Sequence, residues 1–229
     1  MLKENVAEVE RRIEAACRKA GRSRSEVCLI AVSKTKPVSD IEEVLGAGIL
    51  DLGENKPQEM KEKCGALPDN IRWHMIGHLQ TNKVKYVVGR AVMIHSVDSL
   101  KLAEVIEREA EKKGVDVDVL LEVNIAGEES KSGVKPEEAE ALARAVSALP
   151  RVHLRGLMTV PPVCEDPEEV RPYFRKLREL SVDIGAKNID NVSMNVLSMG
   201  MTADFETAIE EGATCVRVGT AIFGERDYN

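Results

Sequence analysis

Aromatic residues are scarce in this 229-residue chain, which holds one Trp, three Tyr and three Phe. Because aromatic side chains supply so little of the core, Val, Leu, Ile and Ala must fill it. Hydrophobic residues make up 43% of the chain and charged residues 31%, a balance typical of a soluble globular protein with a sizeable core. The length also suits one domain, since α/β barrels of this size routinely fold as single units.

Cysteine and histidine are also few, and their spacing argues against a metal site. The five cysteines are odd in number and widely separated, with no Cys-x-x-Cys pair for zinc binding or thiol redox chemistry. They are typical of small buried side chains in a reducing compartment. The four histidines (His74, His78, His95, His153) share no metal-ligand spacing, so we assign them to packing or to the surface and predict no bound metal.

Two further features are missing: an excess of basic residues and a long apolar run. The net charge of −7 argues against nucleic-acid binding, which requires basic surface to neutralise phosphates. No run approaches the roughly 20 apolar residues of a membrane span. The amino terminus MLKENVAEVERR also lacks the apolar segment of a signal peptide. We therefore expect a cytoplasmic protein that binds neither nucleic acid nor membrane.

What the chain does contain is an alternation of short apolar runs with amphipathic segments. Apolar residues at intervals of three and four predict a leading helix within residues 1–21. Eight runs then read as strands, at residues 27–32, 49–53, 72–76, 92–96, 117–124, 154–160, 192–197 and 214–218. Alternating strands and helices require a parallel sheet. We predict a single (β/α)8 TIM-barrel domain over residues 1–229 with an extra N-terminal helix, in preference to an open doubly wound sheet.

Local signals also predict where some helices begin. Ser39 and Glu42 form the pattern of a capping box, and Asp98 is a candidate cap for the helix that ends at Gly114. Asp166 followed by Pro167 is another strong start signal.

The carboxyl ends of barrel strands are where active sites form, so the residues there are the candidates for function. In AVSKTKP the first strand ends on Ser33 and Lys34, although a lone lysine after a strand is most often only a solvated strand end. LSMGMTADF and RVGTAIFG follow the seventh and eighth strands, whose loops commonly bind phosphate in this fold.

Glycines, hydroxyls and a helix starting near Thr202 would suit an anion, although the glycines alone could serve tight turns. The candidate phosphate ligands are Ser198, Gly200, Gly219 and Thr220. A P-loop is excluded, because Glu225 follows Gly224 where that motif requires lysine.

Arg217 is predicted to point inward at the end of the last strand, where a buried guanidinium requires an acceptor. Either a carboxylate of the protein or a ligand could provide it. A lysine, a phosphate site and an arginine around one barrel mouth together suit an aldehyde that carries a phosphate, and pyridoxal phosphate (PLP) is the obvious example.

Seven motifs support this interpretation, in the order AVSKTKP, GENKPQE, WHMIGHLQTNK, SKSG, RGLMTV, LSMGMTADFETAIEEG and VRVGTAIFGERDY. Together they resemble the pyridoxal phosphate homeostasis proteins, single-domain relatives of the alanine racemase barrel. The resemblance extends from the first strand to the C-terminus. The approach to LSMGM, residues 191–195, is more polar than this family pattern, but it belongs to the start of a strand and not to the site.

The resemblance implies a Schiff base between PLP and Lys34, with Lys36 as the alternative. It implies that Asn55 approaches the phenolic oxygen and that Arg217 faces the pyridine nitrogen. Ile76 and Met158 would pack near the ring, while Ser198, Gly200, Gly219 and Thr220 would hold the phosphate. Lys131 of SKSG is a weaker candidate for a role in cofactor transfer.

Two functions remain open, with a third that is weaker. The first is a PLP carrier in cellular PLP homeostasis, without turnover of its own, that supplies PLP-dependent apo-enzymes. The second is a PLP-dependent amino-acid racemase, and the third a Schiff-base aldolase acting on a phosphorylated sugar. The chain ends at Asn229, shortly after the eighth strand, with no room for the second domain that supplies the racemases' opposing base and closes their dimer. We therefore favour a monomeric carrier with no catalytic residues.

Overall fold

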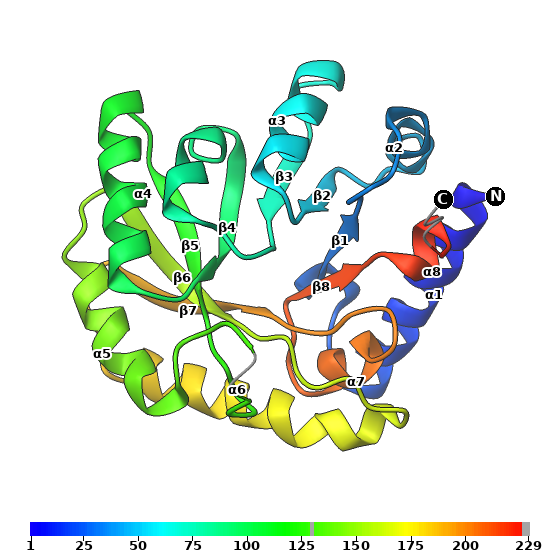
Figure 1. The fold of residues 1–229 in the computed structure, drawn as a ribbon. Helices are drawn as coiled ribbons and strands as arrows, with labels where there is room; N and C mark the ends of the chain where they lie inside the picture. The colour runs from blue at the N-terminus through cyan, green and yellow to red at the C-terminus, as the bar shows by residue number, and fades with distance from the viewer. Residues whose placement is uncertain (129–130, 226–229) are drawn as a thin grey trace.

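Eight short parallel strands close into a barrel in the computed structural model, which describes residues 1–128 and 131–225 (Figure 1). Each strand pairs with the next along the chain, and β8 pairs with β1. The strands are β1 (Cys28–Val32), β2 (Asp51–Glu54), β3 (Arg72–Met75), β4 (Ala91–Val97), β5 (Val117–Glu122), β6 (Val152–Met158), β7 (Val192–Ser198) and β8 (Cys215–Val218). This confirms the predicted barrel, and every predicted strand lies within about two residues of the observed bounds.

Helices cover the outside of the barrel, and most follow a strand directly. The α-helices are α1 (Leu2–Lys19), α2 (Val38–Leu45), α3 (Pro57–Ala66), α4 (Leu100–Lys113), α5 (Pro136–Ser147), α6 (Arg171–Gly185), α7 (Phe205–Glu210) and α8 (Thr220–Phe223). Three 3₁₀ helices join them, η1 (Arg24–Glu26), η2 (Thr81–Tyr86) and η3 (Pro167–Val170). Within the described residues, no helix combines the length and the apolar character that a membrane span requires.

The predicted leading helix is α1, and it completes the outer layer of the barrel. Its apolar face buries Val6, Val9 and Ile13, and the helix packs against α7, α8 and α2 (Figure 1). The last helix, α8, has only four residues and covers little of the barrel by itself. The Asn5 side chain donates a hydrogen bond to the Ile222 carbonyl at 2.8 Å, which fixes α1 beside α8. The extra helix thus fills the outer layer between α7 and α8 on one side and α2 on the other.

Three predicted helix starts differ from the structure. Helix α2 begins after Pro37, so Ser39 lies inside its first turn and does not cap it, because the proline already sets the extended entry. Ser99, not Asp98, caps α4, its hydroxyl accepting from the Leu102 N–H. Helix α7 begins at Phe205, not near Thr202. The start at Asp166 is confirmed, since its carboxylate accepts from the Glu168 N–H and opens η3.

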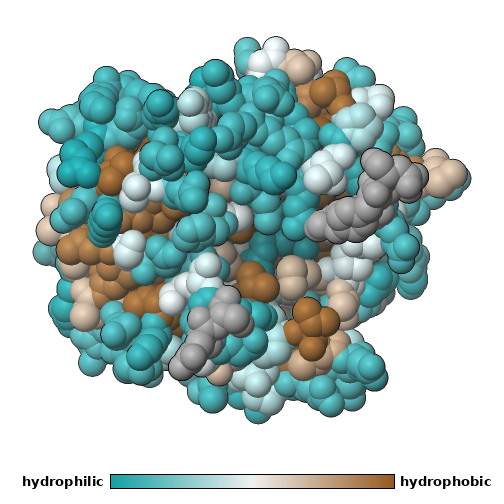
Figure 2. Space-filling model, viewed as in Figure 1, coloured by the Kyte–Doolittle hydropathy of each residue, from teal (hydrophilic) through white to brown (hydrophobic). Residues whose placement is uncertain are grey.

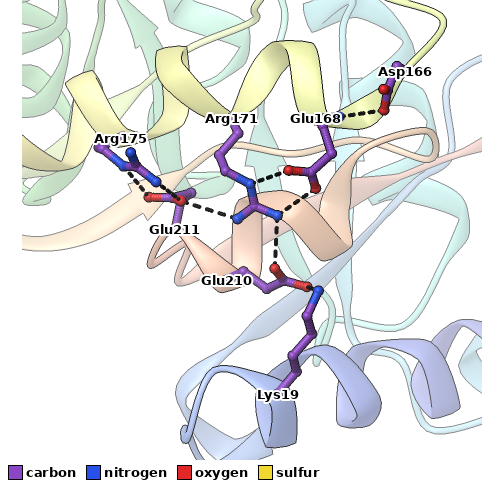
Figure 3. A network of polar contacts seen from close by, with 7 residues as sticks. All are labelled: Lys19, Asp166, Glu168, Arg171, Arg175, Glu210 and Glu211. Atoms are coloured by element: carbon purple, nitrogen blue, oxygen red, sulfur yellow. Dashed lines mark hydrogen bonds and ion pairs between the residues drawn. The ribbon is translucent and has the colours of Figure 1, made fainter.

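A network of charged side chains ties α6, α7 and α1 together (Figure 3). The Arg171 guanidinium donates to Glu168 at 2.6 Å, to Glu210 at 2.9 Å and to Glu211 at 3.1 Å. Arg175 donates to Glu211 as well, and Lys19 of α1 pairs with Glu210 at 2.7 Å. The two arginines lower the pKa of the nearly buried Glu211 carboxyl.

The surface seen in Figure 2 is mostly hydrophilic; its apolar residues show most on the left of this view and in smaller patches elsewhere. The main apolar core lies between the strands and the helices. Inside the barrel, by contrast, several buried side chains are polar: Asp51, His74, His95, Ser198 and Arg217. This polar interior leads to a cavity at the carboxyl ends of the strands.

Candidate functional site

A cavity of about 360 Å³ opens at the carboxyl ends of the strands. Its volume is near the lower end of the range for small-molecule sites, roughly 300–1,000 Å³. The lining residues come from β1 and β8 and from the segments that follow β1, β2, β3, β6, β7 and β8: Val32, Lys34, Asn55, Ile76, Val160, Met201, Thr202, Ala203, Arg217, Gly219 and Thr220. A wider groove of about 730 Å³ lies outside the barrel, beside α2 and α3, and is open to solvent along its length. The mouth cavity lies at the carboxyl ends of the strands, where active sites of this fold form, and Lys34, Asn55 and Arg217 meet there, so we take it as the candidate site.

Lys34 lines this cavity because the chain turns sharply just after it. Thr35 has φ of 66°, a left-handed conformation that is rare for a β-branched residue and costs of order 1–3 kcal/mol. The Thr35 N–H donates to Glu59 Oε1 at 2.5 Å, which holds the turn in place. Lys36 points elsewhere, since its Nζ donates to the carbonyls of Phe223 and Glu225 at 3.0 and 3.2 Å. Of the two candidate lysines, only Lys34 borders the mouth cavity.

A buried ionic network supports the strand end that carries Lys34. Lys63 of α3 donates to Glu54 Oε1, to Glu59 Oε1 and to the Ser33 carbonyl, each at 2.7 Å. The Ser33 hydroxyl donates to the same Glu54 oxygen at 2.6 Å. Burial raises the pKa of the Glu54 carboxyl, and the Lys63 ammonium opposes that shift. The sequence analysis did not predict this network, although Glu54 of the GENK motif lies at a predicted strand end.

Asn55 contributes a polar atom that the described residues leave without a partner. Its side-chain oxygen is buried and accepts no hydrogen bond from them. A buried polar atom in that state costs about 1–3 kcal/mol, so the amide is poised to contact a ligand. Gly77 makes this position possible, because a Cβ there would lie 2.5 Å from the Asn55 carbonyl oxygen.

Arg217 points into the barrel interior and is almost fully buried, with an exposed fraction of 4%. Its guanidinium donates to the Ser198 hydroxyl at 2.6 Å and to the Thr159 carbonyl at 2.8 Å. Burial lowers its pKa to about 10, while Asp204 and Glu122 act in the opposite direction. Its partners are therefore neutral acceptors, not the protein carboxylate that was one of the two alternatives, and the side chain still borders the cavity.

A chain of hydrogen bonds runs from Ser198 down the barrel interior. Ser198 Oγ lies 2.8 Å from His95 Nδ1, His95 Nε2 lies 3.0 Å from His74 Nδ1, and His74 Nε2 lies 3.0 Å from Asp51 Oδ1. Burial and the neighbouring Arg217 and His74 lower the pKa of His95 well below its usual value, so this ring is neutral. The bonds are all satisfied if Ser198 donates to His95, His95 to His74 and His74 to Asp51.

The two predicted phosphate loops do meet, but they contribute unequally to the cavity. Thr202 Oγ1 accepts from the Ala221 N–H at 3.4 Å and so ties the loop after β7 to the loop after β8. Gly219 and Thr220 line the cavity, whereas Ser198 and Gly200 do not border it. Gly200 has φ of 93°, and a Cβ on it would lie 2.6 Å from that of Ala208, so glycine is required for packing. Sequence reasoning missed Met201, Thr202 and Ala203 as lining residues.

Of the remaining candidates, one lines the cavity and two do not. Ile76 lines it, while Met158 is buried at the end of β6 and does not border it. Lys131 donates to the Pro161 carbonyl at 2.8 Å and is not a lining residue. The last residues of the VRVGTAIFGERDY motif, 226–228, lie outside the described part of the chain.

Glu122 is a further acidic group near Arg217 that sequence reasoning did not single out. It ends β5 with an exposed fraction of 8%. Burial, together with the Asp98 carboxylate, raises its pKa to about 7, although Arg217 lowers it. This carboxyl therefore changes its charge near neutral pH.

Comparison with known proteins identifies the family. The family model described as the alanine racemase N-terminal domain matches residues 5–227. A pyridoxal phosphate homeostasis protein from Aquifex aeolicus is 50% identical over 226 residues, which are 98% of each chain. This chain belongs to the pyridoxal phosphate homeostasis protein family. The family resemblance predicted from the seven motifs is thereby confirmed.

Two solved structures have folds similar to that of this chain. PipY of Synechococcus elongatus PCC7942, solved with PLP bound, has a TM-score of 0.84 and 33% identity, covering 98% of this chain and 100% of its own. An alanine racemase of Clostridium difficile 630 has a TM-score of 0.79 at 14% identity, covering all of this chain and 57% of the racemase. The second likeness shows that the barrel fold is shared.

Proposed function

We propose that this protein binds pyridoxal 5′-phosphate in the mouth cavity, holds it as a Schiff base on Lys34 and supplies it to PLP-dependent apo-enzymes in the cytoplasm. One observation carries the proposal: Lys34, the unpartnered Asn55 amide and Arg217 border the same 360 Å³ cavity, beside the loops that follow β7 and β8. The family assignment supports it, and so does PipY, a relative of 33% identity whose structure holds PLP.

The residues of the cavity match the chemical groups of the cofactor one by one. The Lys34 amine is the nucleophile for the aldehyde. The phenolic O–H of the cofactor would donate a hydrogen bond to Asn55 Oδ1, the buried acceptor that has no partner among the described residues. Gly219 and Thr220 would hold the phosphate from the cavity wall, with Ser198 and Gly200 behind them. When bound, PLP supplies an aldehyde that condenses with primary amines and a ring that can withdraw electrons.

The arrangement favours carriage of PLP over turnover of a substrate. A guanidinium facing the pyridine nitrogen, as we propose for Arg217, disfavours a proton there because two positive groups in a buried pocket repel. An unprotonated ring withdraws electrons less well. Racemisation also requires an acid and a base on opposite faces of the substrate. Among the described residues that line the cavity, Lys34 and Arg217 are the only ionisable ones, so neither a carboxylate nor a histidine serves that purpose.

Reduction with borohydride tests the attachment site. We expect purified protein incubated with PLP to show a visible absorption band that borohydride abolishes, and peptide mapping to find the pyridoxyl group on Lys34. Lys34→Ala should lose the band, and Lys36→Ala, the matched control, should keep it. A reduced cofactor on Lys36, or an unchanged band in Lys34→Ala, would overturn the assignment.

Hydrogen exchange separates the carrier from the racemase. The PLP-loaded protein is incubated with L-amino acids in deuterated water, and exchange at Cα is followed by NMR beside a transfer assay to an apo-enzyme. We expect transfer without appreciable exchange. Rapid exchange that depends on Lys34 would reject the carrier and support the racemase, while a colourless protein that cleaves a phosphorylated sugar would support the aldolase. The monomeric state that we propose is checked by light scattering on the same samples.

A further inference from the structure

The end of the barrel opposite the mouth holds a second group of polar side chains. Cys28 begins β1, Asp51 begins β2 and Cys215 begins β8, while His74 reaches the same level from β3. One donor atom from each of Cys28, Asp51 and His74 lies within 4.8 Å of the other two. Cys215 is the register partner of Cys28 across the β1–β8 pair, so the two thiols are neighbours on the same face of the sheet.

This group is accessible from solvent. A cavity of about 460 Å³ opens at the amino end of the barrel, and Cys28, Asp51 and Cys215 border it. His74 lies just inside, with an exposed fraction of 5%. An ion could therefore enter through the cavity and meet all four side chains at its inner end.

We propose that Cys28, Asp51, His74 and Cys215 form a binding site for one divalent zinc ion. Thiolate, imidazole and carboxylate are the groups with which proteins bind zinc, and four of them complete the tetrahedral shell of a closed site. In such a shell, metal–ligand distances of about 2.0–2.3 Å place the ligand atoms about 3.4–3.8 Å apart. Side-chain rotations that bring the donor atoms of Cys28, Asp51 and His74 closer by about 1 Å reach this spacing. Cys215 lies outside that group of three and would join it by rotation of its side chain from the neighbouring register position.

The surroundings of His74 suit a metal ligand. Its Nε2 faces Asp51 Oδ1 at 3.0 Å, and its Nδ1 faces His95 Nε2 at 3.0 Å. A histidine that binds metal through one nitrogen usually forms a hydrogen bond through the other, which fixes the orientation of the ring. With zinc on Nε2, the ring proton sits on Nδ1 and donates to His95. His95 accepts it when its own proton moves to Nδ1, where Ser198 Oγ accepts.

The charges balance when Arg72 is included. Its guanidinium donates to both carboxylate oxygens of Asp51, so the pair is neutral before an ion binds. Zinc adds two positive charges, and the two thiols release two protons to solvent as they become thiolates. The group is thus neutral in both states, with Arg72 retained on Asp51 Oδ2.

The spacing of these residues in the sequence does not indicate a metal site, because they belong to the first three strands and to the last one. The prediction that the cysteines and histidines hold no metal rested on motif spacing alone. The barrel brings Cys28 and Cys215 together although 187 residues separate them, since β1 and β8 are neighbours in the closed sheet.

Cobalt provides the test, because Co²⁺ bound to thiolates in a tetrahedral site absorbs visible light and Zn²⁺ displaces it without colour. Full-length protein that has been reduced, stripped with chelator and freed of PLP is titrated with Co²⁺. We expect one Co²⁺ per chain, with thiolate charge-transfer bands that Zn²⁺ removes. Cys28→Ser and Cys215→Ser should each lose the bands and weaken Zn²⁺ binding at least about a hundredfold. Cys64→Ser, a half-buried cysteine outside the group, should retain both, as should Lys34→Ala.

A second measurement covers the case in which a variant fails to fold. In the wild-type protein, Zn²⁺ should protect Cys28 and Cys215 from alkylation, as read by mass spectrometry, and should leave Cys64 unprotected. Absence of thiolate bands in the wild-type protein, bands of equal strength in Cys28→Ser, or equal alkylation with and without Zn²⁺ would each reject the site. Since Lys34→Ala must bind the ion normally, failure of the PLP proposal leaves this result unchanged.

Discussion

Single residues set the shape of the mouth cavity by the positions they force on their neighbours. Thr35 accepts a left-handed backbone because Glu59 and Lys63 hold it there, and the resulting turn separates Lys34 from Lys36. Gly77 acts in the same way on Asn55, since only a residue without Cβ lets β3 and its loop approach the Asn55 backbone so closely. The chemistry of the site therefore depends on residues that do not border it.

Substitution of Gly77 tests that dependence. Gly77→Ala should displace Asn55 and weaken PLP binding by about 5- to 150-fold, because a hydrogen bond of about 1–3 kcal/mol would be lost. The measurement is a titration followed by the visible absorption of the bound cofactor. Gly65→Ala is the control, since a Cβ there meets no atom within 4 Å, and it should leave binding unchanged. Equal affinity in the two variants would contradict the role of Gly77.

The raised pKa of Glu122 predicts how stability changes with pH. The folded protein keeps this carboxyl protonated up to a pKa of about 7, while the unfolded chain releases the proton near its ordinary value of 4.5. Between these two values the folded state binds more protons, so the residue's contribution to stability is present below pH 4.5 and is lost as the pH rises toward 7.

Glu122→Gln should remove the loss of stability that accompanies the rise in pH from 4.5 to 7. We expect the free energy of unfolding of the variant to exceed that of the wild-type protein by up to about 3 kcal/mol at pH 8, with the difference vanishing near pH 4. Urea denaturation of the cofactor-free proteins at several pH values gives the comparison. A difference that does not vary with pH would show that Glu122 keeps its ordinary pKa.

At the scale of secondary-structure elements, the outer layer is held together by specific contacts as well as by apolar packing. Helix α1 packs beside the short α8 and is anchored by Asn5 and by the Arg12–Glu206 pair at 2.7 Å. On the adjoining side, Arg171 joins η3 to α7 through three glutamates (Figure 3). Glu211 is nearly buried, so its charge depends on Arg171 and Arg175.

Substitution of Arg171 tests how much its contacts with Glu168, Glu210 and Glu211 contribute to the free energy of unfolding. Arg171→Lys keeps the charge but loses the planar set of donors, and should lower the free energy of unfolding by about 1–2 kcal/mol. Arg144→Lys is the control, because Arg144 forms an exposed pair with Glu140 within α5, and it should change stability by less than about 0.5 kcal/mol. Urea denaturation near pH 7 compares them. Losses of equal size would contradict a special role for the junction.

At the scale of the whole molecule, the barrel carries a polar interior between two openings. Arg217 borders the mouth cavity, and Ser198, His95, His74 and Asp51 link it to the amino-terminal cavity by hydrogen bonds of 3.0 Å or less. The apolar core lies in the surrounding layer between strands and helices. A ligand at the mouth should therefore stabilise the entire fold, since unfolding of any barrel strand destroys its site.

Thermal unfolding tests this coupling. PLP at a hundredfold excess over its Kd should add about 2.7 kcal/mol of stability and raise Tm by roughly 5–10 °C for a domain of this size. Pyridoxal without phosphate, at the same concentration, should raise it far less, because it lacks the group that the β7 and β8 loops would hold. Lys36→Ala should respond as the wild-type protein does. Equal shifts with the two forms of the cofactor would contradict the phosphate site.

The sequence by itself determined the architecture and the family. Apolar runs of strand length and the helical periods between them are local patterns, so they predicted the eight strands and the leading helix. Motifs such as AVSKTKP lie at strand ends, which the barrel places at one mouth, and Lys34, Asn55, Ile76, Arg217, Gly219 and Thr220 do border one cavity.

Only the tertiary structure decided which groups contact one another. Helix starts at Ser39 and Asp98 were misplaced because neighbouring residues compete for the cap, and the geometry of the chain entering the helix selects between them. The partners of Arg217, the Lys63–Glu54 network and the meeting of Cys28 with Cys215 join residues far apart in the chain. Such contacts arise from closure of the sheet and the register of its strands, which a local pattern of residues does not encode.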